Sequence, residues 1–275
     1  MIKKAYAKIN ITLNVLGKLD NGYHDLKMIM TPICFFDELE FFESDSDIVE
    51  CDIDIPPKEN IVLKTIKQFK KDVGVNKNVR IILRKKIPIG AGLAGGSADA
   101  AATLRGLNEM WRLKLCDDEL ANIGLKIGAD VPFCIYNQTA VVSGVGDEVR
   151  SINSLQCYVL LVFPGEVVLT KDVFSKTIPE DMKEKSVNEI IDAISKNNID
   201  FVRENAFNDL QSITIENYKR CKDVFNEIAL VDDCFTMTGT GSTFFSLYES
   251  IEEAEKVLIQ LENLGIKALI TRTHP

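Results

Sequence analysis

Glycine is concentrated at one point of the chain, in the segment PIGAGLAGGSADAAA that spans residues 88–102. Four glycines fall within seven positions there: Gly90, Gly92, Gly95 and Gly96. Because glycine has no side chain, its backbone N–H group can approach an anion closely, and a helix N-terminus adds about half a positive charge. We expect Ser97 at the N-cap of the following helix, where its hydroxyl can meet a phosphate oxygen or a phosphate-bound Mg²⁺. This pattern indicates a phosphate-binding loop.

The same spacing, G-x-G-x-x-G, is also typical of a tight surface loop before a packed, alanine-rich helix, and on local evidence this alternative stays open. A dinucleotide-binding fold needs a strand after the helix and an acidic residue about 20 positions on. Here a second helical pattern follows, with Asp117 and Asp118 where its N-cap is expected, which argues against that fold. The chain lacks G-x-x-x-x-G-K-[ST] and the V-A-I-K, H-R-D and D-F-G set, which excludes P-loop kinases and protein kinases.

Two further loops of small residues carry groups that could do chemistry. The segment GADVPF at 128–133 places Asp130 directly after a helix stop and before a proline. The segment TGTGS at 238–242 lies between two expected strands. Each has an ordinary structural interpretation: Asp130 as a turn or capping residue, and the second segment as a hairpin turn. On local evidence these alternatives stay open.

The N-terminal residues 5–17 alternate apolar and polar side chains, which predicts a strand with two different faces. The apolar face carries Ile9, Ile11, Leu13 and Val15. The polar face carries Lys8, Asn10, Thr12 and Asn14. Such a face either contacts solvent or lines a polar cleft, and the strand alone predicts contact with solvent.

The remaining pattern predicts a mixed chain of helices and strands. Helices are expected at 60–73 with Gly74 as the stop, from the glycine-rich segment to about residue 111, from Asp117 towards Gly128, and near 187–197, 204–212, 214–229 and 251–263. Strands are expected at 38–43, 79–84, 139–149, 157–163, 234–238, 243–248 and 266–272. A Pro-Gly pair and a charged segment place a change of domain near 150–165. The final strand-strand-helix-strand order predicts helices on one face of a sheet.

Composition excludes several classes of function. The net charge of −9, with no basic block, argues against a nucleic-acid partner. No apolar run approaches the ~20 residues of a membrane span, so we expect no membrane partner. Seven cysteines, an odd number without a C-x-x-C pair, predict reduced thiols in a cytoplasmic protein and argue against a zinc site. The only two histidines, His24 and His274, are too far apart to form a metal cluster.

Taken together, these segments resemble the GHMP kinase superfamily of small-molecule kinases. Its phosphate-loop pattern P-x-x-x-G-L-x-x-x-S-[SA] is matched by PIGAGLAGGSA, and its C-terminal glycine loop is similar to MTGTGST at 237–243. The resemblance implies an α+β fold of two domains, an N-terminal mixed α/β sandwich followed by a C-terminal α+β sandwich, with the active site in the cleft between them. We expect an ATP-binding domain at 1–155 and a second domain at 156–275.

Within the superfamily, three segments resemble the branch that uses ATP to phosphorylate the 2-hydroxyl of a cytidine-diphosphate-linked methylerythritol in non-mevalonate isoprenoid biosynthesis. They are AKIN at 7–10, LDNGYHDL at 19–26 and GADVPF at 128–133, with weaker matches at ENIV (59–62) and LTKDVF (169–174). The cofactors so implied are ATP and Mg²⁺, and the partner is a small-molecule substrate. Another small-molecule kinase of the superfamily, acting on homoserine or a mevalonate derivative, and a non-catalytic nucleotide-binding regulator are the alternatives. Monomer and dimer both stay open.

The resemblance also implies roles for particular residues. Asp130 would accept the substrate hydroxyl proton, and Lys8 would orient that carboxylate and stabilise charge on the transferred group; the polar strand face then lines a cleft. The ATP site would comprise Pro88, Gly90, Ala91, Gly92, Leu93, Ala94, Gly95, Gly96 and Ser97, with Asn60 and Lys85 near the adenine. The substrate site would comprise Asn10, Tyr23, His24, Thr170, Phe174, Gly239, Thr240 and Gly241. No protein ligand is assigned to Mg²⁺; the Ser97 hydroxyl contacts either the metal or only a phosphate, and both alternatives stay open.

Within this substrate site, the rings of Tyr23 and Phe174 could stack on cytosine, while His24 hydrogen-bonds its edge. An ordinary core role for Phe174 remains the alternative. The chain departs from the pattern at Tyr6, Ala94 and Ala98, where proline, glycine and serine are usual. Of these, Ala94 could reduce the freedom of the phosphate loop.

Overall fold

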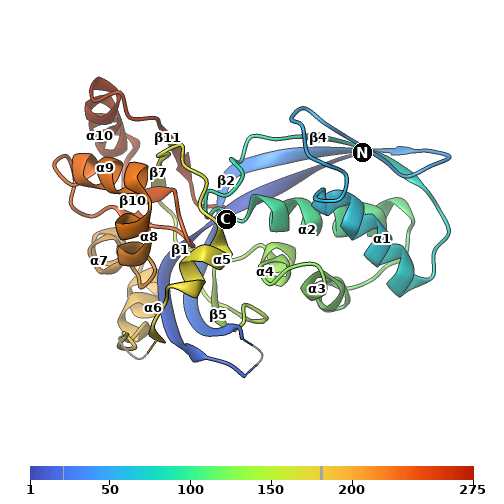
Figure 1. The fold of residues 1–275 in the computed structure, drawn as a ribbon, viewed down its shortest axis with the longest axis horizontal. Helices are drawn as coiled ribbons and strands as arrows, with labels where there is room; N and C mark the ends of the chain where they lie inside the picture. The colour runs from blue at the N-terminus through green and yellow to red at the C-terminus, as the bar shows by residue number, and fades with distance from the viewer. Residues whose placement is uncertain (21, 180–181) are drawn as a thin grey trace. The chain divides into compact units, whose positions relative to one another are not determined.

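The computed structural model describes residues 1–20, 22–179 and 182–275, and it has a mixed α/β architecture (Figure 1). Residue contacts divide the chain into two compact units. The first unit comprises Met1–Ala7, Phe35–Pro88 and Ala94–Asn137; the second comprises Lys8–Cys34, Ile89–Leu93 and Gln138–Pro275. Asn21, within the 19–26 segment, lies outside the described residues. The domain boundary expected near residue 155 stays a prediction.

The first unit combines strands with four helices, which lie together in Figure 1. β4 (Val79–Arg84) pairs antiparallel with the C-terminal part of β2 (His24–Glu43) and parallel with β3 (Ile48–Cys51). The helices are α1 (Ile61–Val73), α2 (Gly95–Met110), α3 (Asp117–Leu125) and α4 (Val131–Tyr136). α2 packs against the other three helices and is therefore central to this unit.

The predicted helix at 60–73 is confirmed, including its two ends. Asn60 caps α1 by accepting the N–H groups of Val62 and Leu63, at 3.0 and 3.3 Å. Gly74 ends it with a left-handed φ of 69°. The buried face of α1 includes Ile66 and Phe69 at helical spacing.

Helix α2 begins earlier than the sequence indicated. Its N-cap is Ala94, with φ 55°, so Ser97 is the third residue of the helix and the prediction of Ser97 as N-cap is wrong. The alanines Ala98, Ala100, Ala101 and Ala102 are all buried, which allows close packing around the first turns. Further along, a Cβ on Gly106 would lie 2.3 Å from the Phe41 ring, so this position must be glycine for α2 to pack on β2.

The second unit holds a four-stranded antiparallel sheet in the order β11 (Ala268–Arg272), β7 (Tyr158–Val162), β10 (Phe244–Tyr248), β9 (Thr236–Met237). α7 (Ile199–Asn205) and α10 (Ile251–Asn263) pack on this sheet, as Figure 1 shows. Ser250 and Glu253 form a capping box at the start of α10, and the predicted helix 251–263 is confirmed. The final strand-strand-helix-strand order is confirmed too.

The second unit also pairs the N-terminal part of β2 with β5 (Ala140–Gly144), and β5 with β6 (Glu148–Ser151). β1 (Ile2–Lys18) pairs parallel with the two-residue strand β8 (Phe207–Asn208). Among its described residues, this unit also contains the helices α5 (Thr170–Ser175), α6 (Asn188–Ser195), α8 (Gln211–Asn217) and α9 (Lys219–Ile228). β1 and β2 contribute residues to both units.

The prediction of a helix at 204–212 is wrong. Ala206 has extended backbone angles, which end α7, and Phe207 and Asn208 pair with β1. The predicted helix 214–229 is broken at Tyr218, also extended, and the predicted strand 139–149 divides into β5 and β6. α4 and α5, with six residues each, were not predicted because so short an element shows no helical period.

The polar face of β1 does not contact solvent, so that prediction is wrong. Lys8, Asn10, Thr12 and Asn14 are each at most 3% exposed, and the apolar face is buried as well. Their polar atoms are satisfied inside the second unit: the Thr12 hydroxyl accepts the Ile29 N–H, and the Asn14 amide exchanges two hydrogen bonds with the Lys185 backbone. Buried polar groups require such partners, which alternation alone does not reveal.

None of the seven cysteines, all of which lie among the described residues, forms a disulfide bond. Among the described residues, no helix combines the length and the apolar character that crossing a membrane requires.

Candidate active site

The N-terminus of α2 presents a bare backbone in the first unit. Ala94 adopts left-handed angles that turn the chain into the helix, and Gly95, Gly96 and Ser97 form its first turn. A Cβ on Gly95 would lie 2.8 Å from the side chain of Ile87, so a larger residue at position 95 would collide with Ile87. The first-turn N–H groups of a helix have no acceptor within it, and their dipoles favour an anion. This end of α2 therefore has the chemistry of a phosphate site.

Asp130 lies in the same unit, at the N-cap position of α4. Its backbone is helical, with φ −79° and ψ −7°, and its carboxylate makes no capping hydrogen bond. Asp130 therefore does not act as a capping residue, one of the two structural roles left open. In the loop before it, a Cβ on Gly128 would lie 3.8 Å from the Ser97 hydroxyl, which brings the 128–133 segment next to the start of α2.

Lys8 occupies a buried position in the second unit, with 3% of its surface exposed. Its Nζ donates to Asn10 Oδ1 at 2.5 Å and to the carbonyl oxygen of Gly92 at 2.7 Å. Two defined acceptors restrict a long side chain that would otherwise sample many rotamers. The structure thus brings together one predicted catalytic residue, one predicted substrate residue and one residue of the phosphate loop.

The two glycine loops interlock around Lys8. A Cβ on Gly92 would lie 2.1 Å from the Thr238 carbonyl oxygen, and a Cβ on Gly239 would lie 2.9 Å from the Gly92 carbonyl oxygen. Both glycines have positive φ, 74° and 58°. Only residues without a Cβ allow this contact and this conformation together. The second loop connects the antiparallel strands β9 and β10, as the hairpin interpretation required, and it also contacts predicted site residues.

Other predicted residues of the second unit surround this junction. The Gly90 carbonyl accepts the Val168 N–H at 3.2 Å, and the Ala91 carbonyl accepts the Thr243 N–H at 3.3 Å. The hydroxyls of Thr170 and Thr240 lie 3.3 Å apart. The segments around 90 and 168 and the C-terminal glycine loop are therefore neighbours, although they are distant in sequence.

His24 and Phe174 form a stacked pair in the second unit. Their ring centroids are 4.9 Å apart with an interplanar angle of 30°. His24 is 8% exposed, and its Nε2 has no hydrogen-bond partner in the described part of the chain. Burial, with the nearby Lys18 charge, lowers the pKa of His24 and favours the neutral imidazole. By contrast, the neighbouring Tyr23 is 64% exposed.

Lys85 and Asn60, predicted near the adenine, already have protein partners. Lys85 Nζ donates to Asp37 Oδ2 at 2.5 Å and Asp99 Oδ2 at 2.7 Å, with its side chain 5% exposed. Asn60 Oδ1 caps α1. The ammonium of Lys85 lies 3.4 Å from the Cβ position of Gly95, so this buried ion cluster adjoins the start of α2.

The ion cluster contains two carboxylates and one ammonium. Burial, with Asp37 as a like charge and Lys85 in opposition, raises the pKa of Asp99 to about 7. Asp99 Oδ1 is buried without a partner among the described residues. Asp37 and Asp99 were not predicted as site residues, although an acidic residue inside the alanine run 98–102 is itself a signal of a buried charge partner.

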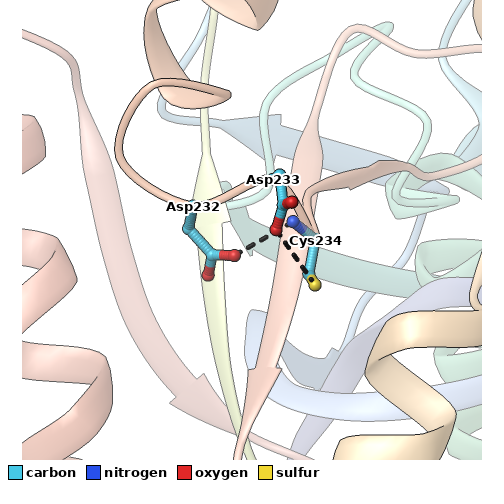
Figure 2. A group of neighbouring side chains, drawn as sticks. All are labelled: Asp232, Asp233 and Cys234. Atoms are coloured by element: carbon cyan, nitrogen blue, oxygen red, sulfur yellow. Dashed lines mark hydrogen bonds between the residues drawn. The ribbon is translucent and has the colours of Figure 1, made fainter.

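A separate group of potential metal ligands, Asp232, Asp233 and Cys234, precedes β9 in the second unit (Figure 2). The oxygens of Asp232 are already engaged. Oδ2 accepts hydrogen bonds from Arg203 and Tyr248, and Oδ1 accepts the Cys234 N–H. A guanidinium that neutralises the carboxylate opposes cation binding, so this group has the character of a structural network.

Comparisons with known proteins agree with this geometry. The GHMP kinases N-terminal domain matches residues 60–138. The chain is 37% identical, over 98% of its length and 99% of the relative's, to a 4-diphosphocytidyl-2-C-methyl-D-erythritol kinase from Clostridium botulinum. It is 38% identical to a protein of the same name from Bacillus cereus, over 90% of this chain and 88% of that one.

Solved structures give the same result. The crystal structure of a 4-(cytidine 5'-diphospho)-2C-methyl-D-erythritol kinase has a TM-score of 0.84, with 27% identity and all of both chains covered. A homoserine kinase from Cytophaga hutchinsonii, at 17% identity and a TM-score of 0.71 over 99% of this chain and 94% of that one, shares the fold. The chain therefore belongs to the 4-diphosphocytidyl-2-C-methyl-D-erythritol kinase family, within the GHMP kinases.

Proposed function

We propose that this protein transfers the γ-phosphoryl group of ATP to the 2-hydroxyl of 4-diphosphocytidyl-2-C-methyl-D-erythritol, giving the 2-phosphate and ADP. The observation that carries the proposal is the arrangement around Lys8. A buried ammonium lies where two glycine loops meet, held by Asn10 Oδ1 and by the Gly92 carbonyl. Phosphoryl transfer depends mainly on positioning and on neutralising charge, and a fixed cation beside a phosphate loop supplies both.

The nucleotide phosphates are assigned to the loop from Pro88 to Ser97. The bare first turn of α2 supports this assignment, because its N–H groups and its dipole both favour an anion. Mg²⁺, bound with the nucleotide, would neutralise charge on the phosphates. The Ser97 hydroxyl, an oxygen donor on that first turn, fits the ligand preference of this ion. Asn60 and Lys85 are proposed to lie next to the adenine. Asn60 is held there as the cap of α1, and Lys85 as part of the buried ion cluster.

Asp130 is proposed as the acceptor of the substrate hydroxyl proton. Its carboxylate makes no capping hydrogen bond, and it lies in the loop next to Ser97. A general base typically contributes 10²- to 10⁴-fold to a rate. Lys8 is proposed to stabilise the charge that develops on the transferred group.

The cytidine end of the substrate is assigned to the second unit. The His24–Phe174 stack supplies flat aromatic surface, and the buried Nε2 of His24 lacks a partner among the described residues. An unpartnered buried nitrogen is unfavourable until a ligand supplies the missing hydrogen bond. The neutral imidazole suits the edge of an uncharged base. Asn10, Tyr23 and Thr170, with the loop Gly239–Gly241, are proposed to complete this site.

We further propose that the nucleotide is held by an N-terminal domain of residues 1–155 and the substrate loop by a C-terminal domain of residues 156–275. The cysteine usage, seven residues without a C-x-x-C pair, supports a reducing, cytoplasmic location.

An acceptor panel tests the function. The protein is incubated with ATP and Mg²⁺ and, in separate reactions, with 4-diphosphocytidyl-2-C-methyl-D-erythritol, homoserine and mevalonate. We expect phosphorylation of the first compound alone. Turnover of only the other two would overturn the substrate assignment. ATP binding without turnover of any acceptor would instead favour a non-catalytic nucleotide-binding regulator.

A further inference from the structure

Thr238 lies at the centre of a hydrogen-bond network inside the second unit. Its side chain is fully buried. The hydroxyl accepts the N–H of Asn10 at 3.0 Å. It also lies 3.2 Å from Asn10 Oδ1 and 3.2 Å from the carbonyl oxygen of Gly92. A hydroxyl has one proton, so Thr238 donates to one of these two acceptors at a time.

The same two acceptors hold Lys8. Asn10 Oδ1 and the Gly92 carbonyl are the groups that receive the Lys8 ammonium, at 2.5 and 2.7 Å. Thr238 and Lys8 therefore share both acceptors. The Thr238 hydroxyl and the Lys8 ammonium together determine where these two acceptor oxygens lie. Asn10 Oδ1 receives a third bond, from the N–H of Gly239 at 2.9 Å.

Thr238 is itself held in place from the other side. Asn208 Nδ2 donates to the carbonyl oxygens of Met237 and Gly239, both at 2.7 Å, and these residues flank Thr238. Asn208 Oδ1 accepts the Leu210 N–H at 2.9 Å, which fixes the orientation of the amide. Since Asn208 lies opposite Leu13 in the β1–β8 pair, the loop is anchored to the strand that carries Lys8.

We propose that Thr238 is the positioning residue for Lys8: its hydroxyl fixes the Asn10 side chain and the Gly92 carbonyl, and through them the lysine ammonium. The proposal rests on the proposed function, because it concerns the lysine assigned to phosphoryl transfer. Without the hydroxyl, the buried Asn10 N–H loses its acceptor, and the two acceptors of Lys8 lose a shared contact. Small displacements of a catalytic group reduce turnover far more than they reduce binding.

Three variants test this. Thr238→Val removes the hydroxyl at nearly constant shape, and Thr238→Ser keeps it. Thr273→Val is the matched control, since Thr273 is also buried in the second unit and its hydroxyl also accepts a backbone N–H, that of Cys157 at 3.2 Å. Each variant is assayed for kcat and for KM of both substrates, and for amide hydrogen exchange at Asn10 and Gly239.

We expect Thr238→Val to lower kcat by about 10- to 100-fold with both KM values within about twofold of the wild type. Thr238→Ser should restore kcat to within about threefold, and Thr273→Val should keep the wild-type kcat, because its hydroxyl contacts Cys157 and not the acceptors of Lys8. Exchange at Asn10 and Gly239 should be faster in Thr238→Val alone. If that variant does not fold, Thr238→Ala is judged by the same criteria.

Equal kcat in Thr238→Val and Thr273→Val, or unchanged exchange at Asn10, would overturn the proposal. A loss of kcat that Thr238→Ser does not restore would overturn it as well. The exchange measurement does not depend on turnover. If the wild-type protein phosphorylates no acceptor, the proposed function fails, while exchange at Asn10 and Gly239 still decides whether Thr238 fixes these groups.

Discussion

The ammonium of Lys8 lies 2.7 Å from the carbonyl oxygen of Gly92, a residue 84 positions away in the sequence. This contact joins the N-terminal strand to the phosphate loop within the second unit. It depends on the close approach of Gly92 to Thr238, because any side chain at position 92 would enter the space of the Thr238 carbonyl. The position of the lysine and the absence of a side chain at Gly92 are thus parts of one arrangement.

Gly92→Ala should disrupt this junction. The new Cβ would lie 2.1 Å from the Thr238 carbonyl oxygen and 2.9 Å from that of Gly241, both backbone atoms, at a φ of 74°. Gly265→Ala is the matched control, since Gly265 has a similar φ of 72° and nothing within 4 Å. We expect the Gly92 variant to lose at least about 2 kcal/mol more unfolding free energy than the control, because overpacking adds to backbone strain. Urea unfolding measures this, and equal losses in the two variants would contradict it.

Ala94→Gly should relax the phosphate loop. Ala94 has φ 55°, where a Cβ is unfavourable by about 1 kcal/mol, while the entropy of a glycine in the unfolded chain offsets part of the gain. We expect unfolding free energy to rise by up to about 1 kcal/mol and KM for ATP to fall. Asn137→Gly is the control, because Asn137 has a similar φ of 52° but tolerates it better and ends α4. An unchanged KM for ATP would show that Ala94 does not weaken nucleotide binding.

Asp99→Asn should alter the pH dependence of stability. Burial raises the pKa of Asp99 to about 7, so between about pH 4 and 7 the folded state holds a proton that the unfolded chain releases. The unfolding free energy contributed by Asp99 therefore falls as pH rises through this window, by up to about 1.4 kcal/mol per pH unit. The asparagine variant should gain stability relative to the wild type from pH 5 to 7.

Urea unfolding at pH 5, 6 and 7 measures this difference. Asp192→Asn serves as the control, because the Asp192 side chain is 75% exposed and its curve should run parallel to that of the wild type. If the Asp99→Asn curve is also parallel to the wild type, the carboxyl carries no proton at neutral pH in the folded protein.

Elements with strong local signals could be predicted from the sequence. Asn60 and Gly74 mark both ends of α1, and Ser250 with Glu253 marks the start of α10, because caps act over three or four residues. The prediction of a helix at 204–212 was wrong because Phe207 and Asn208 pair with β1. Their partners in β1 lie almost 200 positions earlier in the sequence. Local propensity contains no information about such a partner.

The candidate site, too, could be predicted from the sequence only in part. Glycine spacing and the family resemblance predicted the phosphate loop and Lys8, and the structure places Lys8 against Gly92. The alternation of polar and apolar residues did not predict that the polar face of β1 is buried, since alternation looks the same whether solvent or protein covers that face. Thr238 was missed because its role arises from three contacts, all with residues at least 146 positions away. The roles assigned to Asp130 and to the substrate residues stay predictions.

Turnover by Asp130→Asn tests the central claim, that the loop at the start of α2 holds the nucleotide and directs its γ-phosphoryl group to an alcohol whose proton Asp130 accepts. Asp192→Asn is the control, and ATP binding in the presence of Mg²⁺ is measured by calorimetry for each protein. We predict that kcat on 4-diphosphocytidyl-2-C-methyl-D-erythritol falls at least ~100-fold in Asp130→Asn while ATP still binds. Wild-type turnover by Asp130→Asn would contradict the account.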